Sequence, residues 1–285
     1  ATINFHDGPL PRYAGLNTPA WALMNGETAY GVSWHLVTPG VDEGDLLAQR
    51  GFEIAEDETS LSINTRCFAE GLDAFSELVG RLESGTETRT PQDLSQRTVY
   101  RRDDRPPAAA FVDWEASAEA VGRLVRALDF GPYPNALATP KVRARGRVLT
   151  LTAAEPVDEA PEGAPGEIVE ADGHGLTIAC GEGALRATRF LDPTGQELSA
   201  RGVEGLFGGA PDRRFDRLSE EERAALDAWT ARTAKAERFW LRRLEQLEPV
   251  ELPNAQEATG SGAPAVETLA LPDASSTGSS GPAAC

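Results

Sequence analysis

Strand-like and helix-like segments alternate over the first ninety residues, and this alternation constrains the fold more than any other feature. Residues 2–5 and 30–37 are rich in β-branched and aromatic side chains, which predicts two strands. Residues 19–25 and 60–82 carry apolar side chains at helical spacing, which predicts two helices. In the longer helix the expected apolar face consists of large side chains: Leu61, Phe68, Leu72, Phe75, Val79 and Leu82. Because such alternation is typical of α/β domains, we predict an α/β domain over residues 1–90.

A second unit is predicted after a polar, arginine-rich linker at residues 91–110. Residues 117–128 have apolar side chains at the spacing of a short amphipathic helix. Four strand-like segments follow, at residues 147–152, 167–171, 175–180 and 184–191. The turn residues Asp172, Gly173 and His174 separate two of them and predict a hairpin. Residues 111–205 therefore predict a small β-barrel or sandwich of the OB type.

The last eighty residues change character twice. Ser219 and Glu222 have the spacing of a capping box, which predicts a helix within a junction segment at residues 206–253. Trp229, Phe239 and Trp240 are too apolar for a helix face in water, so we expect that face to dock on another part of the chain or on a neighbouring domain. Residues 254–285 are mostly Ala, Gly, Ser, Thr and Pro, which predicts a disordered linker or tail.

The charge balance excludes several classes of protein. The net charge is −18, only two of the 27 basic residues are lysines, and no basic patch is visible, so nucleic acids and anionic membranes are not expected as partners. No apolar run is long enough to span a bilayer, and no signal peptide is apparent at the first residues. The three cysteines have no paired spacing, which favours a reducing cytoplasm and gives no metal site.

Reactive side chains gather where the two predicted strands of the first domain end. Asn4, His6 and Asp7 close the first strand, and Asp42, Glu43 and Asp45 follow the second. An amide can donate to a developing oxyanion, a histidine can move a proton near neutral pH, and a carboxylate can orient the histidine. That set suits acyl-type transfer to an amine, although satisfied polar residues with no catalytic role have the same pattern. His35 lies within the second strand, and we interpret it as a packed residue.

Four motifs carry a resemblance to a known family: Asn4-Phe5-His6, Leu10-Pro11-Arg12-Tyr13-Ala14-Gly15, Gly31-Val32-Ser33-Trp34-His35 and Gly40-Val41-Asp42-Glu43-Gly44-Asp45. In this order and at these separations they resemble the 10-formyltetrahydrofolate-dependent formyltransferases. That family includes methionyl-tRNA, sugar-nucleotide and peptide-synthetase formyltransferases. The second unit is similar to the family's C-terminal barrel at Asp129-Phe130-Gly131 and from Asn135 to Lys141.

The resemblance implies roles for particular residues. Asn4, His6 and Asp42 match the catalytic positions, and 10-formyltetrahydrofolate would be the cosubstrate. Asn4 and protonated His6 would stabilise the oxyanion, and Asp42 would orient His6 and relay the proton of the amine. Leu10 and Pro11 would contact the folate, and Asp45 is either a further folate contact or a residue that starts a helix.

Two departures from the family pattern add expectations. A serine is common in the family where Gly8 stands, so we expect a more mobile loop after His6. The family's domain begins with a nucleotide-fold half that precedes the Asn-His strand, whereas this chain starts at that strand. The resemblance therefore implies the C-terminal half of a Rossmann-like domain with an exposed sheet edge, poorly stable and inactive alone.

The net charge of the second unit bears on which acceptor receives the formyl group. Residues 113–205 contain nine basic and fifteen acidic residues, a net charge of −6, which disfavours tRNA. The motif Gly31 to His35 and residues 236–250 resemble formylation domains of nonribosomal peptide synthetases, which implies an aminoacyl group on a carrier protein. Two alternatives remain: a non-catalytic interaction or linker module of a synthetase, and a methionyl-tRNA or sugar-nucleotide formyltransferase.

Overall fold

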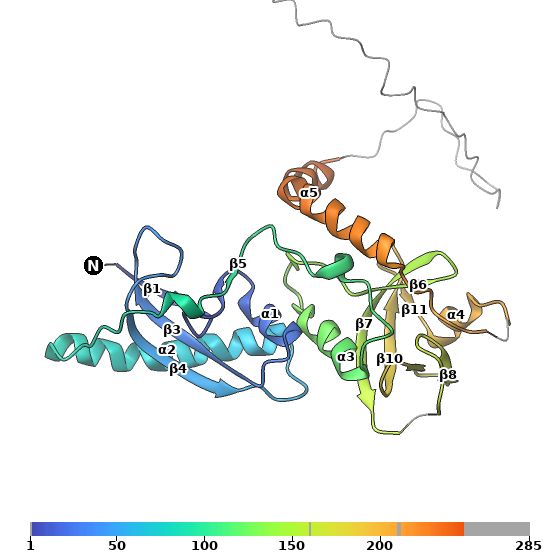
Figure 1. The fold of residues 1–285 in the computed structure, drawn as a ribbon, viewed down its shortest axis with the longest axis horizontal. Helices are drawn as coiled ribbons and strands as arrows, with labels where there is room; N and C mark the ends of the chain where they lie inside the picture. The colour runs from blue at the N-terminus through green and yellow to red at the C-terminus, as the bar shows by residue number, and fades with distance from the viewer. Residues whose placement is uncertain (1, 160, 210–211, 248–285) are drawn as a thin grey trace, which may run out of the picture. The chain divides into compact units, whose positions relative to one another are not determined.

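The computed structural model describes residues 2–159, 161–209 and 212–247 (Figure 1). The chain divides into a large unit, Ala1–Leu241, and a second unit, Arg242–Cys285. Only residues 242–247 of the second unit are described. The predicted disordered tail, 254–285, and the end of the junction segment lie outside the described residues.

Three antiparallel strands form the sheet of the first domain. Their order is β1 (Ile3–His6), β3 (Ala29–Leu36) and β4 (Leu46–Glu53). The predicted strands correspond to β1 and β3, whereas β4 was not expected from the sequence. Two short parallel strands, β2 (Ala14–Gly15) and β5 (Val99–Tyr100), pair beside it. The mixed α/β class is confirmed; the three-stranded sheet is antiparallel, unlike the parallel sheet of a complete nucleotide-binding fold.

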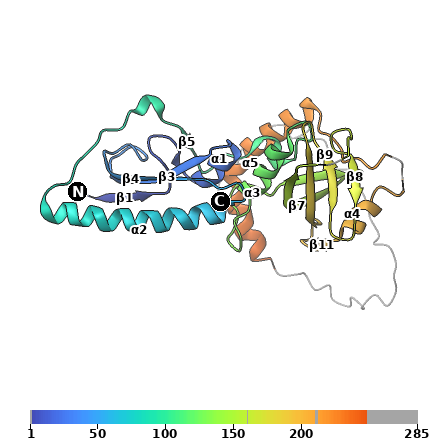
Figure 2. The ribbon, with the colours of Figure 1, turned by 90° about the horizontal axis from the view of Figure 1, so that it is seen from below.

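This domain has two helices, α1 (Thr18–Met24) and α2 (Ser60–Ser84), and α2 packs on β3 and β4. Figures 1 and 2 both show α2 running along the sheet. Its N-cap, Thr59, forms a capping box with Ser62. The predicted apolar face of α2 is wrong: the helix buries Ile63, Cys67, Gly71, Ala74 and Leu78, while Phe68 is 56% and Leu72 is 67% exposed. Small side chains on the buried face allow the helix to approach the sheet closely.

The segment between the two domains is not a plain linker. It contains two 3-10 turns, η1 (Leu94–Gln96) and η2 (Pro107–Ala110), as well as β5. The side chain of Gln92 donates to the carbonyl oxygens of Asp42 (2.9 Å) and Gly44 (2.7 Å), and Arg97 donates to that of Val41 (2.6 Å). This segment therefore holds the loop between β3 and β4 in place.

The second domain is built on one antiparallel sheet. The strands are β6 (Lys141–Ala144), β7 (Arg147–Val157), β10 (Ala184–Leu191), β9 (Leu176–Ala179) and β8 (Ile168–Ala171) in that order, with β11 (Glu197–Leu198) paired to β10. The four predicted strands correspond to β7, β8, β9 and β10. Asp172 accepts from the backbone of His174 and Gly175 in the predicted hairpin turn. The sheet forms a half-barrel, so the expectation of a small β-domain is confirmed, and its assignment to the OB type stays a prediction.

Two further helices and three aromatic side chains close the core of this domain. The helices are α3 (Ala118–Ala127) and α4 (Ala200–Gly205). Trp114, Phe207 and Phe215 are buried together, and the Phe215 ring centroid lies 5.3 Å from that of Trp114. Phe207 and Phe215 lie beyond the boundary at residue 205 that the sequence indicated, so the core of this domain includes part of the predicted junction.

Helix α5 (Glu220–Glu245) begins at the predicted capping box, where Ser219 and Glu222 exchange side-chain and backbone hydrogen bonds. Trp229 and Trp240 are 55% and 57% exposed, and they line a groove of about 440 Å³ with Ala109 and Lys141. Within the described residues, the rest of the chain therefore covers this face of α5 only in part.

Candidate active site

Four polar side chains lie on one face of the three-stranded sheet. In the register of β1 and β3, Asn4 pairs with His35 and His6 pairs with Ser33. Successive side chains of a strand point to opposite faces, so these four share a face and their neighbours Phe5 and Trp34 point to the other. Trp34 donates its indole N–H to the carbonyl oxygen of Gly71 on α2, which shows that Phe5 and Trp34 face the helix. The polar face is therefore the one away from α2.

Asp42 reaches this face from the loop between β3 and β4. Its backbone has a left-handed φ of 53°, and its carboxylate accepts from the backbone N–H of Gly15 at 2.9 Å. The bonds from Gln92 and Arg97 fix the same loop. The Asp42 side chain is 13% exposed, so the carboxylate is held by the fold rather than by water.

The three residues proposed as catalytic meet through a fourth, His35. Asn4 Nδ2 lies 3.2 Å from His35 Nε2, and that nitrogen lies 3.4 Å from Asp42 Oδ1. The other carboxylate oxygen of Asp42 lies 3.6 Å from His6 Nδ1. Asn4, His35, Asp42 and His6 thus form a continuous polar network.

The environment of Asp42 favours its charged form. Burial acts to raise the pKa of Asp42, but the hydrogen bond with His35, the charge of His6 and the N–H of Gly15 outweigh it. The pKa of this carboxyl consequently lies below its ordinary value of 3.8. Asp42 therefore contributes a carboxylate to the network at neutral pH.

The protonation of His6 follows from one backbone contact. Its Nε2 lies 2.6 Å from the carbonyl oxygen of Tyr13, which can only accept, so Nε2 carries a proton. Nδ1 is left facing two carboxylates, at 3.6 Å from Asp42 and 3.8 Å from Asp7. His6 is 5% exposed, and Nδ1 is the ring nitrogen that the Tyr13 contact leaves available.

His35 positions Asn4, a role that the sequence interpretation missed. Its Nδ1 donates to the carbonyl oxygen of Leu36 at 2.9 Å, so in the neutral ring Nε2 accepts one amide hydrogen of Asn4. The second amide hydrogen of Asn4 stays available for a ligand. In the imidazolium form the same Nε2 donates to Asp42. The two-residue spacing of Ser33 and His35 indicates that both lie on one face of their strand. Only the register of β1 with β3 places His35 opposite Asn4.

Gly8 provides space for His6. A Cβ at this position would lie 2.7 Å from His6 Nε2 and 2.7 Å from the carbonyl oxygen of Tyr13. The carbonyl oxygen of Gly8 also accepts from the hydroxyl of Ser33 at 2.7 Å. The residue therefore leaves room for the His6 to Tyr13 contact and is itself hydrogen-bonded, and the mobility of this loop stays a prediction.

The three residues expected to contact folate lie at different places. Leu10 is buried, with its N–H donating to Ser33 and its carbonyl oxygen accepting from Gln49. Pro11 follows it through a cis peptide bond. Asp45 precedes β4, where its carbonyl oxygen accepts from the N–H of Leu36, so it does not start a helix. Their contacts with folate stay a prediction.

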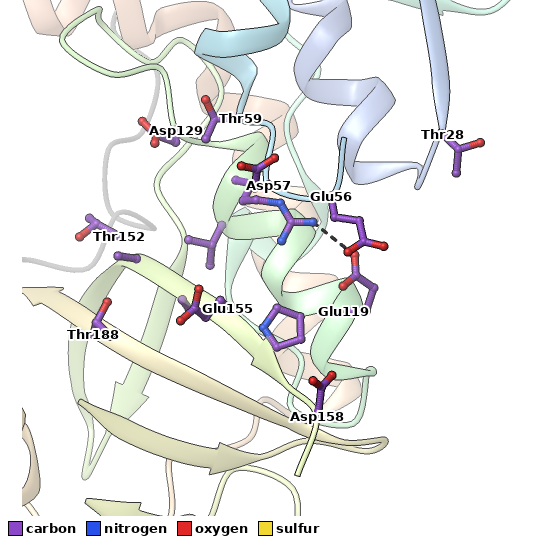
Figure 3. Close-up of a pocket in the computed structure, with 15 residues that line it drawn as sticks. Thr28, Glu56, Asp57, Thr59, Glu119, Asp129, Thr152, Glu155, Asp158 and Thr188 are labelled. Atoms are coloured by element: carbon purple, nitrogen blue, oxygen red, sulfur yellow. Dashed lines mark hydrogen bonds and ion pairs between the residues drawn. The ribbon is translucent and has the colours of Figure 1, made fainter. Parts of the chain in front are cut away.

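An acidic cavity of about 830 Å³ lies between α3, β7 and the loop that precedes α2 (Figure 3). Six of its lining side chains are carboxylates: Glu56, Asp57, Glu119, Asp129, Glu155 and Asp158. Arg126 is the basic residue of the lining and pairs with Glu119 at 3.2 Å. Among the described residues, no group of three or more His, Cys, Asp or Glu side chains is arranged to hold a metal ion. In the same part of the chain, no helix is long and apolar enough to cross a membrane.

Two family models match the chain. Residues 1–79 match the model described as "Formyl transferase", and residues 106–203 match "Formyl transferase, C-terminal domain". Over these two segments, which include the site, the chain belongs to the formyl transferase family.

Individual proteins that are similar in sequence or in fold support this family assignment. A methionyl-tRNA formyltransferase of Burkholderia multivorans is 35% identical over 216 residues, which are 75% of this chain and 63% of the relative. An N-formyltransferase of Helicobacter canadensis, solved with folinic acid and dTDP-3-aminofucose, has a TM-score of 0.55 at 19% identity, covering 65% of each chain. HypX of Aquifex aeolicus, solved with tetrahydrofolic acid, has a TM-score of 0.57 at 24% identity, over 76% of this chain and 36% of that one. The two structures show a shared fold, and this chain spans less than two thirds of its curated relative.

Proposed function

We propose that this protein transfers a formyl group from 10-formyltetrahydrofolate to a primary amine. The observation that carries the proposal is the network of Asn4, His35, Asp42 and His6 in a segment that belongs to the formyl transferase family. In the overall reaction a bond forms between the amine nitrogen and the formyl carbon, the bond to N10 of the folate breaks, and one proton passes from the amine to the folate nitrogen.

The residues present fit a formyl carbonyl and an attacking amine. The free amide hydrogen of Asn4 can donate to the carbonyl oxygen, where negative charge grows as the amine adds. His6 holds or moves a proton at Nδ1, and the Asp42 carboxylate beside it stabilises the imidazolium. Because His6 and Asp42 are largely buried, the interaction between their charges is stronger than it would be in water.

Replacement of Asp42 tests the proposal. We expect Asp42→Asn to lower turnover by at least about a hundredfold, the usual size of a general acid–base contribution, while the circular dichroism spectrum stays unchanged. The measurement is release of tetrahydrofolate from 10-formyltetrahydrofolate with an amine acceptor. Asp73→Asn is the matched control, because it removes the same charge from an exposed position on α2.

The outcomes separate the enzyme from a non-catalytic module. Turnover in Asp42→Asn equal to that of the control would refute the role of Asp42. No turnover of the unmodified, folded protein with any amine offered would refute formyl transfer by this chain. Binding of a synthetase domain without binding of 10-formyltetrahydrofolate would support the interaction or linker module instead.

Two observations bear on the acceptor, and they point in different directions. The relatives act by name on methionyl-tRNA, and the Helicobacter canadensis structure contains an amino-sugar nucleotide, so the comparisons favour these acceptors over a carrier protein. Negative charge on the second domain and in the cavity of Figure 3 opposes a phosphate backbone. A carrier-bound aminoacyl thioester fits that negative charge better. The proposal of this acceptor is supported by the charge and by the resemblance to synthetase formylation domains alone.

Competition between acceptors decides the question. We expect an aminoacyl thioester on a carrier protein to be formylated with a higher kcat/KM than methionyl-tRNA. A preference for methionyl-tRNA that falls steeply with salt concentration would refute the carrier-protein acceptor, because phosphate contacts give that salt dependence.

A further inference from the structure

A second, smaller cavity has Asp7, the residue after His6, in its wall. Its volume is about 200 Å³, and Asp7, Asn17, Leu61, Asn64, Phe130 and Tyr133 line it. These residues come from the end of β1, from the start of α1, from the first turns of α2 and from the segment after α3. The cavity is thus built by both domains, and its lining residue Asp7 lies 3.8 Å from His6 of the network.

Asp7 presents a carboxylate in the wall of this cavity. Its Oδ1 lies 3.8 Å from His6 Nδ1, and the side chain is 31% exposed. The backbone is held on both sides, because the hydroxyls of Thr18 (3.2 Å) and Tyr30 (2.8 Å) donate to the carbonyl oxygen of Asp7. Among the described residues, no arginine or lysine forms an ion pair with this carboxylate. The Thr18 hydroxyl can also donate to Asp7 Oδ1, at 3.4 Å, and the carboxylate in the cavity wall can accept a further hydrogen bond from a ligand.

We propose that this cavity binds the acceptor, with its ammonium group on Asp7 and the adjoining side chain between Leu61 and Phe130. The inference rests on the proposed function, since it names the acceptor side of the same site. An amine bound to Asp7 as the ammonium form lies next to His6 Nδ1, which can take the proton that must leave before the nitrogen attacks. The ammonium and the carboxylate complement each other in charge.

The size and chemistry of the walls limit the class of acceptor. A volume of about 200 Å³ corresponds to roughly six or seven water molecules, at about 30 Å³ each. That space holds an amino group with a small or medium aliphatic side chain, and it is too small for a nucleotide. Asn17 and Asn64 add amide groups that can bond a neighbouring carbonyl oxygen. The ligand class is therefore an α-aminoacyl group of modest size, whose carrier lies outside the cavity.

Steady-state kinetics of Asp7→Asn test the binding of the amine. With the glycyl and leucyl thioesters of N-acetylcysteamine as acceptors, we expect KM for the amine to rise about tenfold, the effect of losing one charge-assisted hydrogen bond at a partly exposed site. The KM for 10-formyltetrahydrofolate should stay unchanged, and Asp73→Asn should behave as the unmodified protein. An unchanged KM for the amine, or an equal rise in both KM values, would overturn the assignment.

Asn64→Phe tests the cavity separately. A larger side chain in the wall should reduce kcat/KM for the leucyl thioester at least about tenfold more than for the glycyl thioester. Equal effects on both acceptors would show that their side chains do not enter the cavity.

A binding measurement keeps the inference distinct from the proposed function. In an NMR titration of the full chain with leucinamide, the side-chain amide signals of Asn17 and Asn64 should shift, and Asp7→Asn should weaken binding about tenfold. If the amide binds in this way and no turnover occurs, the proposed function fails and the site stands. Turnover of the unmodified protein with no dependence on Asp7 in either assay refutes the site and leaves the proposed function intact.

Discussion

Removal of His35 should weaken the fold and change its dependence on pH. The side chain is 3% exposed, and its Nε2 is the contact shared by Asn4 and Asp42. His35→Leu keeps a side chain of similar bulk in the sheet but provides no polar atom. In the neutral form of His35 the variant removes the acceptor of one Asn4 amide hydrogen, and in the imidazolium form it removes a donor to Asp42.

The expected loss of stability follows from the one group that loses its partner in each form of the ring. A buried polar group without a partner costs about 1–3 kcal/mol, so we expect the free energy of unfolding to fall by about that amount. His35→Gln should lose less than half of this, because a glutamine amide can accept from Asn4 and donate to Asp42. The measurement is urea denaturation of the three proteins at pH 7.

The dependence on pH provides a second readout that a simple packing defect would not change. The folded-state pKa of Asp42 is below its ordinary value of 3.8, so its ionisation contributes stability above the unfolded pKa that is lost as pH falls through the folded value. His35→Leu removes one cause of that lowering, and the pKa of Asp42 should rise. The unmodified protein should therefore lose more stability than the variant between about pH 5 and about pH 3. Equal losses over this interval, or His35→Leu as stable as His35→Gln, would refute the reasoning.

Three further substitutions test other contacts. Gly8→Ala should lower the free energy of unfolding by about 1–3 kcal/mol, because the new Cβ overlaps His6 and the Tyr13 carbonyl oxygen, and the imidazole NMR signals of His6 should shift. Phe215→Ala should cost about 3–5 kcal/mol in the same urea assay, since Phe215 is 1% exposed in the half-barrel core. Lys141→Met should cost about 1–3 kcal/mol, because Lys141 donates to the carbonyl oxygens of Ala109 and Thr139; no change would show that these bonds do not stabilise the protein.

The sequence predicted local structure best where one pattern determined it. The capping box of α5 and the strands β7 to β10 follow from short-range signals, and the structure contains them. The buried face of α2 was predicted wrongly because large apolar residues such as Phe68 and Leu72 dominate the periodic pattern. The sheet instead requires close approach, which small residues such as Gly71 permit: a Cβ at Gly71 would lie 2.3 Å from the Phe5 ring.

The part of the candidate site that depends on local strand geometry was predictable, and the part that depends on strand pairing was not. The two-residue spacing of Asn4 and His6 places both on one face of any strand, whatever that strand pairs with. The role of His35 depends on the antiparallel register of β1 with β3, which a single sequence does not specify. The bracing of the Asp42 loop by Gln92 and Arg97 connects residues about fifty positions apart along the chain, and no periodicity reports such contacts.

Helix α3 belongs to two cores at once, and this limits how the chain can be divided. Val121 and Val125 pack in the core of the half-barrel, while Ala127 and Leu128 pack in the core of the first domain. The hydroxyl of Ser60, at the first residue of α2, donates to the carbonyl oxygen of Ala127 at 2.6 Å. A cut in the interdomain segment would therefore remove part of the support of the sheet that holds Asn4 and His6. The two domains should melt in one cooperative transition, and a portable catalytic module made from this protein must retain both.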